Sequence, residues 1–440
     1  MGKLLFLTML TSSQIKVCVA VAKKIIELFG DKHEIYIPVD KDWEPKVKEM
    51  CPEIKCITFQ RPSEELQRQF FARTGKKKED VFAEICEQYN QIWCNFDRAE
   101  VVNRMASFYK IIFNHLIKFH PIVNEIVKQV APDFIVTSFH VSTPLGIDRN
   151  IPYAMLLTSS PTFFGHEFLP PPMSDLPSEP TLENIKIWEK FFEEAYLLEH
   201  FDMKERINFW LKQRNCPNLD ERNFYLVESP YLNISLYPKE IDYNPNLVKL
   251  PGKWLKLDSA ICNPLPEPIV IPEKLKNLPG KLVYVDFGNQ PFIYLYHVKE
   301  VLKLLPTLKH RFIVCTGSID LKDADNIYTE KNIESLSALQ VADVVICHGG
   351  TKIITDSFHL GVPQIIIPLF GDQIDNGRRI DDKKLGIRLY TSEISHQVID
   401  EAINKSCNPT LMKKLKEISN RIKTENGLKN VCLEICKFLK

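Results

Sequence analysis

The chain of 440 residues lacks an excess of charge of either sign. Its 56 lysines and arginines are balanced by 56 aspartates and glutamates. Nucleic acids and anionic membrane surfaces are commonly bound through a basic excess, so we expect neither as a partner. The balance favours a small molecule as the ligand.

Long apolar runs are also missing. No stretch approaches the roughly 20 apolar residues that a membrane-spanning helix requires. The N-terminal run at 3–10 is apolar, but it is short and leads into a helical pattern without a small-residue cleavage site. We therefore expect a first β-strand there and no membrane span.

The sequence has no CxxC pair among its 12 cysteines and no GxGxxG after its first strand. The missing glycine motif disfavours a Rossmann dehydrogenase. Cys18, Cys315 and Cys347 lie inside apolar patterns, which favours reduced, buried thiols. The closely spaced cysteines near either end lack further ligands nearby, so we expect no metal site.

The segment 341–376 carries the clearest pattern in the chain. An apolar run over 344–346 predicts a buried parallel strand, and His348-Gly349-Gly350 follows where a helix must begin. The first amides of a helix have no internal partners, so a diphosphate placed there gains hydrogen bonds and a favourable dipole. Lys352 would add a positive charge.

The remainder of this segment completes a strand–helix–strand unit. Gly361 suits a left-handed helix end, and the next strand is expected over 364–368. Polar residues then form a loop at the carboxyl end of that strand, where open α/β sheets bind ligands. Asp372, Gln373 and Asn376 would suit sugar hydroxyls there. The alternative is an ordinary connection in which glycine only caps the helix.

The length suggests two domains. The chain starts with a strand, a helix over 14–29 and a second strand over 33–39, and a Pro-rich segment interrupts it later. We expect the domains and segments 1–261, 262–279 (linker), 280–415 and 416–440 (a helix crossing back). Residues 60–130 are expected to be mainly helical, with aromatic side chains that form either core or an acceptor pocket.

The spacing of HGG, GVP, Pro368, DQ and Asn376 resembles the donor-binding signature of the UDP-dependent glycosyltransferases. Phrases at 229–243 and 250–259 look most like the cytosolic arthropod branch, particularly mite enzymes. The resemblance covers nearly the whole chain. It implies an α/β fold of the GT-B type, with two facing Rossmann-like domains, a cleft between them, and a C-terminal helix packed on the first domain.

The resemblance also implies a function. Members transfer a hexose from a UDP-sugar, here expected to be UDP-glucose, to a small lipophilic acceptor, with no other cofactor, and many act in detoxification. Membrane-anchored animal members carry a tail that this chain lacks, so we expect a cytoplasmic location. The sequence does not indicate the oligomeric state or the acceptor.

The chain departs from the family at both catalytic positions. A histidine after the first strand normally deprotonates the acceptor, and an aspartate orients that imidazole. Ungapped matching places Gln14 at the histidine position and Ser138 at the aspartate position. An amide has no useful basicity. His140 is a possible substitute base, although a lone histidine is more often structural.

The donor site is altered at several positions and kept at others. Ser335 stands where a glutamine binds the uracil, Ile353 where a hydroxyl binds the diphosphate, and Asp356 where a glutamate holds the ribose. The residues expected to bind the donor are Gly288, Asn289, Ser335, His348, Gly349, Gly350, Lys352, Ile353, Asp356, Asp372, Gln373 and Asn376.

Three hypotheses follow from this pattern. The first is an inverting UDP-dependent hexosyltransferase with weakened or atypical base catalysis. The second is a non-catalytic member that binds a nucleotide sugar or an apolar ligand. The third is a transferase that uses a different donor.

Overall fold

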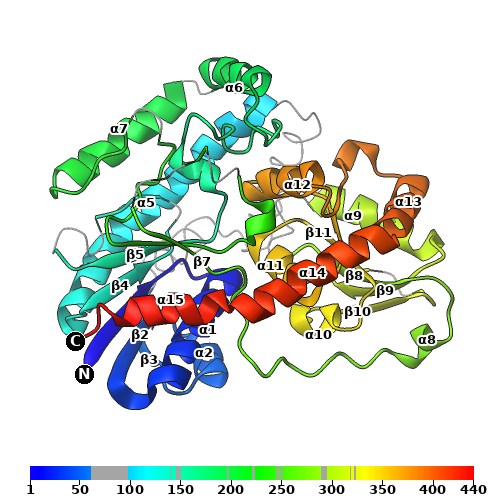
Figure 1. The fold of residues 1–440 in the computed structure, drawn as a ribbon, viewed down its shortest axis with the longest axis horizontal. Helices are drawn as coiled ribbons and strands as arrows, with labels where there is room; N and C mark the ends of the chain where they lie inside the picture. The colour runs from blue at the N-terminus through cyan, green and yellow to red at the C-terminus, as the bar shows by residue number, and fades with distance from the viewer. Residues whose placement is uncertain are drawn as a thin grey trace, which may run out of the picture.

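The computed structural model consists of two parallel β-sheets with helices on their faces (Figure 1). It describes residues 1–60, 98–139, 141–144, 150–195, 198–220, 223–243, 247–248, 250, 252–288, 295–317, 319–321 and 324–440. The two sheets lie in separate halves of the molecule, and the C-terminal helices run from one half to the other (Figure 1).

The first sheet is built from the N-terminal half of the chain in the order β3-β2-β1-β4-β5-β6-β7. Its strands are β1 (Gly2–Leu7), β2 (His33–Val39), β3 (Lys55–Thr58), β4 (Phe134–Thr137), β5 (Tyr153–Leu157), β6 (Leu232–Ser235) and β7 (Trp254–Lys256). The accompanying helices are α1 (Ser12–Phe29), α2 (Glu44–Met50), α5 (Arg98–Val130), α6 (Leu182–Ala195) and α7 (Leu198–Lys212).

The second sheet has the order β10-β9-β8-β11-β12-β13. Its strands are β8 (Leu282–Asp286), β9 (Arg311–Cys315), β10 (Ile327–Glu330), β11 (Val344–Cys347), β12 (Gln364–Ile366) and β13 (Ile387–Arg388). The helices in the C-terminal part of the chain are α8 (Glu273–Lys276), α9 (Leu295–Leu304), α10 (Ser335–Leu339), α11 (Thr351–Leu360), α12 (Asp372–Asp382), α13 (His396–Ser406), α14 (Pro409–Glu425) and α15 (Gly427–Cys436).

Local sequence explains why the central unit of the second sheet forms. Every residue of β11 is buried, as expected for an apolar strand in the middle of a parallel sheet. The helix α11 ends at Leu360 because Gly361 adopts the left-handed conformation, with φ of 75°. The strand, turn and helix predicted for 344–361 are therefore confirmed.

Other expectations are corrected by the structure. The strand expected over 364–368 ends at Ile366, and Asp372 begins helix α12 instead of lying in a loop. Cys315 is only partly buried, unlike Cys18 and Cys347. The ten cysteines that lie within the described residues are all free thiols. The Pro-rich segment 262–279 carries a one-turn helix, α8.

The C-terminal crossover consists of two helices instead of one. Asn426 is left-handed, with φ of 49°, and separates α14 from α15 while its side chain accepts a hydrogen bond from the Lys429 amide. Apolar residues of α14 pack in the core of the second sheet. Those of α15 pack with α1 and the first sheet, so the end of the chain closes the core of the first domain (Figure 1).

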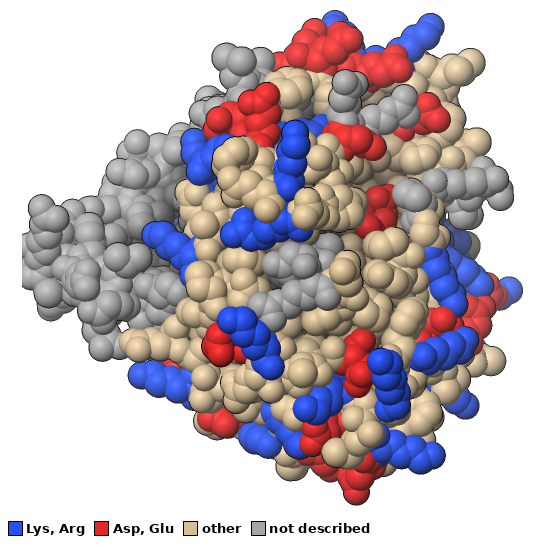
Figure 2. Space-filling model, turned by 90° about the vertical axis from the view of Figure 1, so that its left-hand side faces the viewer, with Lys and Arg blue, Asp and Glu red and all other residues tan. Residues whose placement is uncertain are grey.

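The distribution of charge on the surface and the apolar content of the helices agree with the composition of the sequence. On the face drawn in Figure 2, basic and acidic side chains of the described residues are interspersed. Within the described ranges, no helix is long and apolar enough to cross a membrane. Of the helical region expected over 60–130, residues 61–97 lie outside the described residues, whereas Tyr109 and Phe113 on α5 are core residues.

Candidate functional site

A cavity of about 500 Å³ lies between the two sheets. Its walls come from α5 and from residues at or after the carboxyl ends of β1, β5 and β6 in the first domain. In the second domain they come from residues at or after the carboxyl ends of β8, β9, β10, β11 and β12. This is the edge at which parallel α/β sheets bind ligands. The described part of the chain thus has a site to which both domains contribute.

The His348-Gly349-Gly350 turn forms part of the second-domain wall. Gly349 has φ of 84°, and a Cβ atom there would stand 2.7 Å from Ile366 Cγ2. A Cβ atom on Gly350 would stand 2.6 Å from His348 Nε2. Both glycines are therefore required for the turn to pack closely. The turn delivers the N-terminus of α11 to the cavity, where its first amides and its dipole favour an anion.

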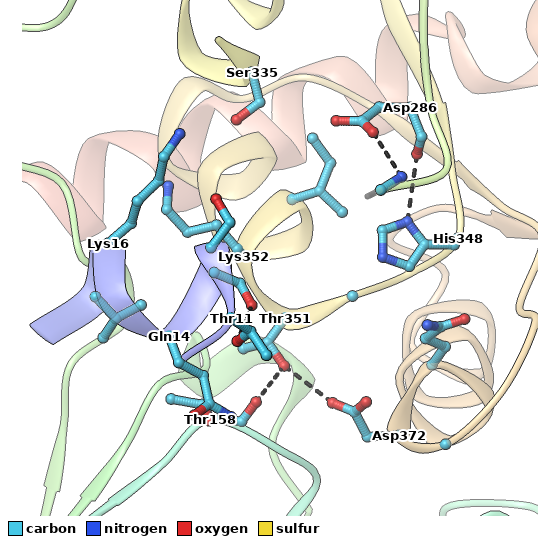
Figure 3. A pocket seen from close by; sticks show the side chains of 18 of the residues that line it. Thr11, Gln14, Lys16, Thr158, Asp286, Ser335, His348, Thr351, Lys352 and Asp372 are labelled. Carbon is cyan, nitrogen blue, oxygen red and sulfur yellow. Dashed lines mark hydrogen bonds between the residues drawn. The ribbon is translucent and has the colours of Figure 1, made fainter. Parts of the chain in front are cut away.

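His348 is held in one orientation beside this turn. Its Nδ1 lies 3.4 Å from the backbone oxygen of Asp286 (Figure 3). Desolvation by the surrounding protein lowers the pKa of His348. Gly288, with φ of 75°, lies against the ring, and a Cβ atom there would stand 3.0 Å from His348 Cε1. The imidazole is consequently neutral near pH 7 and packed between two glycines.

Thr351 joins the two domains at the base of the cavity. Its Oγ1 lies 2.8 Å from the Thr158 backbone oxygen and 3.1 Å from Asp372 Oδ2 (Figure 3). The buried Tyr237 hydroxyl lies 2.6 Å from the same Thr351 oxygen. These bonds fix the first turn of α11 against the first domain.

Several predicted donor-binding side chains instead support the turn from behind. Asn376 is fully buried and does not line the cavity; its Nδ2 donates to the Gly349 backbone oxygen at 3.0 Å. Gln373 reaches the cavity wall, but its Oε1 accepts bonds from the Leu369 and Phe370 amides. The amide of Asn376 therefore supports the HGG turn, and the amide of Gln373 supports the loop before α12.

Asp356 does not line the cavity either. It is fully buried on α11, and its Oδ2 forms an ion pair with Lys352 and lies 3.5 Å from Ser335 Oγ. Burial raises the pKa of Asp356, and the neighbouring Lys352 opposes that rise. Ser335, Lys352 and Ile353 do line the cavity. Of the twelve predicted donor-binding residues, Asn289 lies outside the described residues.

The two predicted catalytic positions lie side by side in the first domain. Ser138 Oγ donates to Thr8 Oγ1 at 2.6 Å and lies 3.4 Å from Gln14 Oε1. Thr8 Oγ1 also donates to Gln14 Oε1 at 3.1 Å. Gln14 lines the cavity. The structure thus brings Gln14 and Ser138 together in a neutral hydrogen-bonded group, whereas His140 lies outside the described residues.

Sequence reasoning missed three charged groups on the wall, Lys16, Glu334 and Asp286. Lys16, one turn into α1, forms an ion pair with Glu334 across the cavity at 2.6 Å. Asp286 ends β8, and its Oδ1 accepts a bond from the Gly288 amide at 2.7 Å. A polar residue that ends an apolar strand was a visible signal for Asp286. Figure 3 shows Lys16 extending toward the wall that carries Lys352 and Ser335.

Solved structures of glycosyltransferases have a similar arrangement. The structure resembles that of the glycotransferase of kitacinnamycin over 100% of this chain and 99% of that chain, with a TM-score of 0.67 and 13% identity. It resembles CalG4, the calicheamicin glycosyltransferase, over 99% and 98%, with a TM-score of 0.64 and 14% identity. The fold is GT-B. The predicted fold class is confirmed.

The second GT-B domain also matches a family by sequence. Residues 283–430, which include the HGG turn, match the Glycosyltransferase family 28 C-terminal domain. A sterol 3-beta-glucosyltransferase of Komagataella phaffii is 27% identical over 240 residues, which are 50% of this chain and 20% of that protein. An NDP-glycosyltransferase of Bacillus subtilis, YjiC, is 28% identical over 116 residues, 26% of this chain and 30% of that protein. The matched segment therefore spans less than a third of either relative.

Proposed function

We propose that this GT-B protein transfers a hexose from a UDP-sugar, with UDP-glucose as the first candidate, to a small lipophilic acceptor. The match of residues 283–430 to a glycosyltransferase domain supports the reaction class. Relatives named as sterol 3-beta-glucosyltransferases support glucose and an apolar acceptor. The family resemblance supports UDP, a cytoplasmic location and a role in detoxification.

The observation that carries the proposal is the position of the HGG turn. It places the N-terminus of α11, with Lys352 on its first turn, on the wall of a cavity shared by both domains. In transfer, an acceptor oxygen attacks the anomeric carbon while the bond to the β-phosphate breaks. Backbone amides and a lysine there would stabilise the departing diphosphate.

The acceptor side supports atypical base catalysis. By the family resemblance, Gln14 and Ser138 stand where an imidazole and a carboxylate are expected. Their side chains are in contact, and neither takes up a proton near pH 7. Loss of a general base commonly costs about 10²- to 10⁴-fold in rate. Positioning and leaving-group stabilisation remain available to the protein.

The second candidate is a binding protein that holds a nucleotide sugar without transferring the sugar. The same neutral Thr8–Gln14–Ser138 group favours it. The two candidates make the same prediction for donor binding and differ in turnover.

Calorimetric titration with UDP and UDP-glucose, followed by assays of UDP release and sugar transfer, tests both candidates. Gly350→Ala should weaken UDP binding at least about tenfold, because the added Cβ displaces His348 and disturbs the amides that bind phosphate. Gly30→Ala is the control for backbone strain away from the site. Its φ of 58° disfavours alanine, but a Cβ atom there meets nothing within 4 Å and Gly30 lies at the far end of α1, so UDP affinity should not change. Equal UDP affinity in the wild type and Gly350→Ala would contradict the assignment of the phosphate site.

A further inference from the structure

A first-domain side chain, that of Tyr237, lies in the core of the second domain. Tyr237 follows β6 of the first sheet, yet it is 0% exposed and belongs to the apolar core of the second sheet. The guanidinium of Arg379 lies over its ring. Tyr237 does not line the cavity. Its ring is therefore fixed in place, and its hydroxyl can act on a ligand only through another residue.

The Tyr237 hydroxyl reaches two residues that do line the cavity. Its oxygen lies 2.6 Å from Thr351 Oγ1 and 3.3 Å from Asp372 Oδ2. Thr351 begins α11 at the expected phosphate site, and Asp372 begins α12, where the sequence predicts sugar binding. Burial raises the pKa of Tyr237, so its hydroxyl keeps its proton and can donate it. One buried hydroxyl of the first domain thus contacts both expected parts of the donor site.

The hydroxyl groups of Tyr237 and Thr351 have one proton each to donate. Thr351 Oγ1 also lies 2.8 Å from the Thr158 backbone oxygen and 3.1 Å from Asp372 Oδ2 (Figure 3). The Thr158 carbonyl and the Asp372 carboxylate can both receive a hydroxyl proton only while both hydroxyl groups are present. Without the Tyr237 hydroxyl, the single proton of Thr351 has to serve two acceptors.

The bonds that Asp372 receives all end on one oxygen of its carboxylate. Besides Tyr237 and Thr351, the Asn376 side-chain amide donates to Asp372 Oδ2 at 3.3 Å. Among the described residues, none donates to Oδ1, and Asp372 is only partly buried on the cavity wall. A carboxylate that is held through one oxygen can accept a hydrogen bond from a ligand hydroxyl with the other.

We infer that Tyr237 is a positioning residue for the donor sugar, because its hydroxyl and that of Thr351 hold Asp372 with Oδ1 available to a sugar hydroxyl. This inference rests on the proposed function. Tyr237 comes from the first domain, whereas Asp372 comes from the second. The affinity for the sugar therefore depends on the contact between the two domains.

The diphosphate depends less on Tyr237 than the sugar does. The amides at the start of α11 belong to the second domain, and Thr351 can still donate to the Thr158 oxygen when Tyr237 has no hydroxyl. Asp372, in contrast, then loses a donor. Loss of the Tyr237 hydroxyl should therefore weaken sugar binding and preserve binding of the diphosphate.

The test is calorimetric titration of the wild type and Tyr237→Phe with UDP and UDP-glucose. The measured quantity is the Kd for UDP-glucose divided by the Kd for UDP, which isolates the contribution of the sugar. We expect this ratio to rise about tenfold in Tyr237→Phe, as for loss of one hydrogen bond to a charged group, while the Kd for UDP stays within about twofold. An unchanged ratio, or equal weakening of both ligands, would overturn the inference.

Tyr243→Phe is the matched control. Tyr243 is also buried, its ring centroid lies 5.2 Å from the same guanidinium of Arg379, and its hydroxyl is paired with Ser160. This variant should leave the ratio unchanged. An equal rise in both variants would mean that loss of any buried hydroxyl beside Arg379 weakens sugar binding, and the specific role of Tyr237 would be wrong.

A double-mutant cycle tests whether Tyr237 acts through Asp372. Asp372→Ala alone should raise the ratio, and its affinity for UDP reports whether the variant is folded. Adding Tyr237→Phe to Asp372→Ala should raise the ratio no further, since the group that Tyr237 positions is already gone. Effects that multiply would contradict the inference, because Tyr237 would then influence the sugar by another route.

Failure of this inference is distinguishable from failure of the proposed function. If UDP-glucose binds and the ratio is the same in the wild type and in Tyr237→Phe, the positioning role is wrong and the donor site stands. If the wild type does not bind UDP-glucose, the proposed function is wrong, and the inference about Tyr237 is wrong with it.

Discussion

Arg379 shows how a single residue outside the cavity holds the HGG turn in place. It is 1% exposed on α12, and its Nη2 donates to Asn376 Oδ1 at 2.6 Å, while Asn376 in turn donates to Gly349. Its Nη1 donates to the Ile241 backbone oxygen at 3.0 Å. The guanidinium lies over the ring of Tyr237, 4.4 Å from its centroid. A first-domain segment and the HGG turn therefore depend on the same side chain.

Replacing Arg379 with methionine should lower the free energy of unfolding by about 2 to 6 kcal/mol, because it leaves two buried acceptors, on Ile241 and Asn376, unpaired at about 1 to 3 kcal/mol each. The neighbouring Arg378 pairs with Asp382 near the surface, and Arg378→Met should cost less than about 1 kcal/mol. Urea denaturation followed by circular dichroism measures both. Similar losses of unfolding free energy in the two variants would show that the loss does not arise from the burial of Arg379.

For individual residues, the sequence predicted the glycines that the backbone geometry requires. It did not predict the partners that polar side chains find far away in the chain. Gly349 and Gly350 could be assigned because a helix start at a tight turn restricts the residue type. Asp356 and Asn376 were predicted to face the donor, yet they are engaged by Lys352 and by Gly349. Nothing in the local pattern distinguishes a polar side chain that faces a ligand from one that supports a turn.

At the scale of elements, α12 ties the second domain to a first-domain segment. Asp375 on this helix accepts a bond from the Met173 amide at 2.8 Å and from the Thr162 hydroxyl at 2.9 Å. Further along, Asp382 accepts from the amide and the hydroxyl of Ser178, both at 2.8 Å. The two domains are thus joined by hydrogen bonds to carboxylates.

Asp375 should make stability depend on pH. Burial raises its pKa from 3.8 to about 7, against the opposing effects of Thr162 and Arg379. The folded protein therefore binds a proton more tightly than the unfolded chain does. Stability from this group is greatest below about pH 4, falls between about pH 4 and 7, and is lowest above pH 7, by at most roughly 4 kcal/mol.

Comparison with Asp375→Asn isolates this contribution, since asparagine does not titrate. The free energy of unfolding of the wild type, minus that of the variant, should decrease as the pH rises from about 4 to 7 and then stay constant. Urea midpoints measured across this range provide the difference. A difference that increases with pH would mean that the carboxylate is stabilised by its partners and that its pKa is lowered.

Predictions of elements succeeded where the apolar period was unambiguous. The strand over 33–39 and the helix ending at Leu360 have the predicted bounds. The terminal helix over 416–440 was predicted as one piece, whereas the left-handed backbone of Asn426 divides it into α14 and α15. The domain on which α14 or α15 packs depends on the direction of the chain after Asn426. The spacing of apolar residues does not determine that direction.

At the scale of the whole molecule, the end of the chain belongs structurally to its beginning. Leu428, Val431, Cys432 and Ile435 of α15 are buried in the core that contains β1 and α1. Phe438 stacks on Phe134 of β4, with ring centroids 4.4 Å apart. Before this crossover, Arg421 of α14 bonds Glu240 and Asp258, which lie outside the second sheet. The C-terminal end of the chain therefore binds the second domain to the first.

This arrangement predicts that a substitution in the last helix destabilises the N-terminal domain. Ile435 is 0% exposed, so Ile435→Ala should lower the free energy of unfolding of that domain by about 2 to 4 kcal/mol. Leu433, on the same helix, is 40% exposed, and Leu433→Ala should cost less than about 0.5 kcal/mol. All 5 tryptophans lie before residue 255, so tryptophan fluorescence during urea unfolding reports on the first domain. If α15 lay on the surface without contributing to the core, the urea midpoint measured by fluorescence would be the same in both variants. A lower midpoint in Ile435→Ala alone would establish that the two ends of the chain form one core.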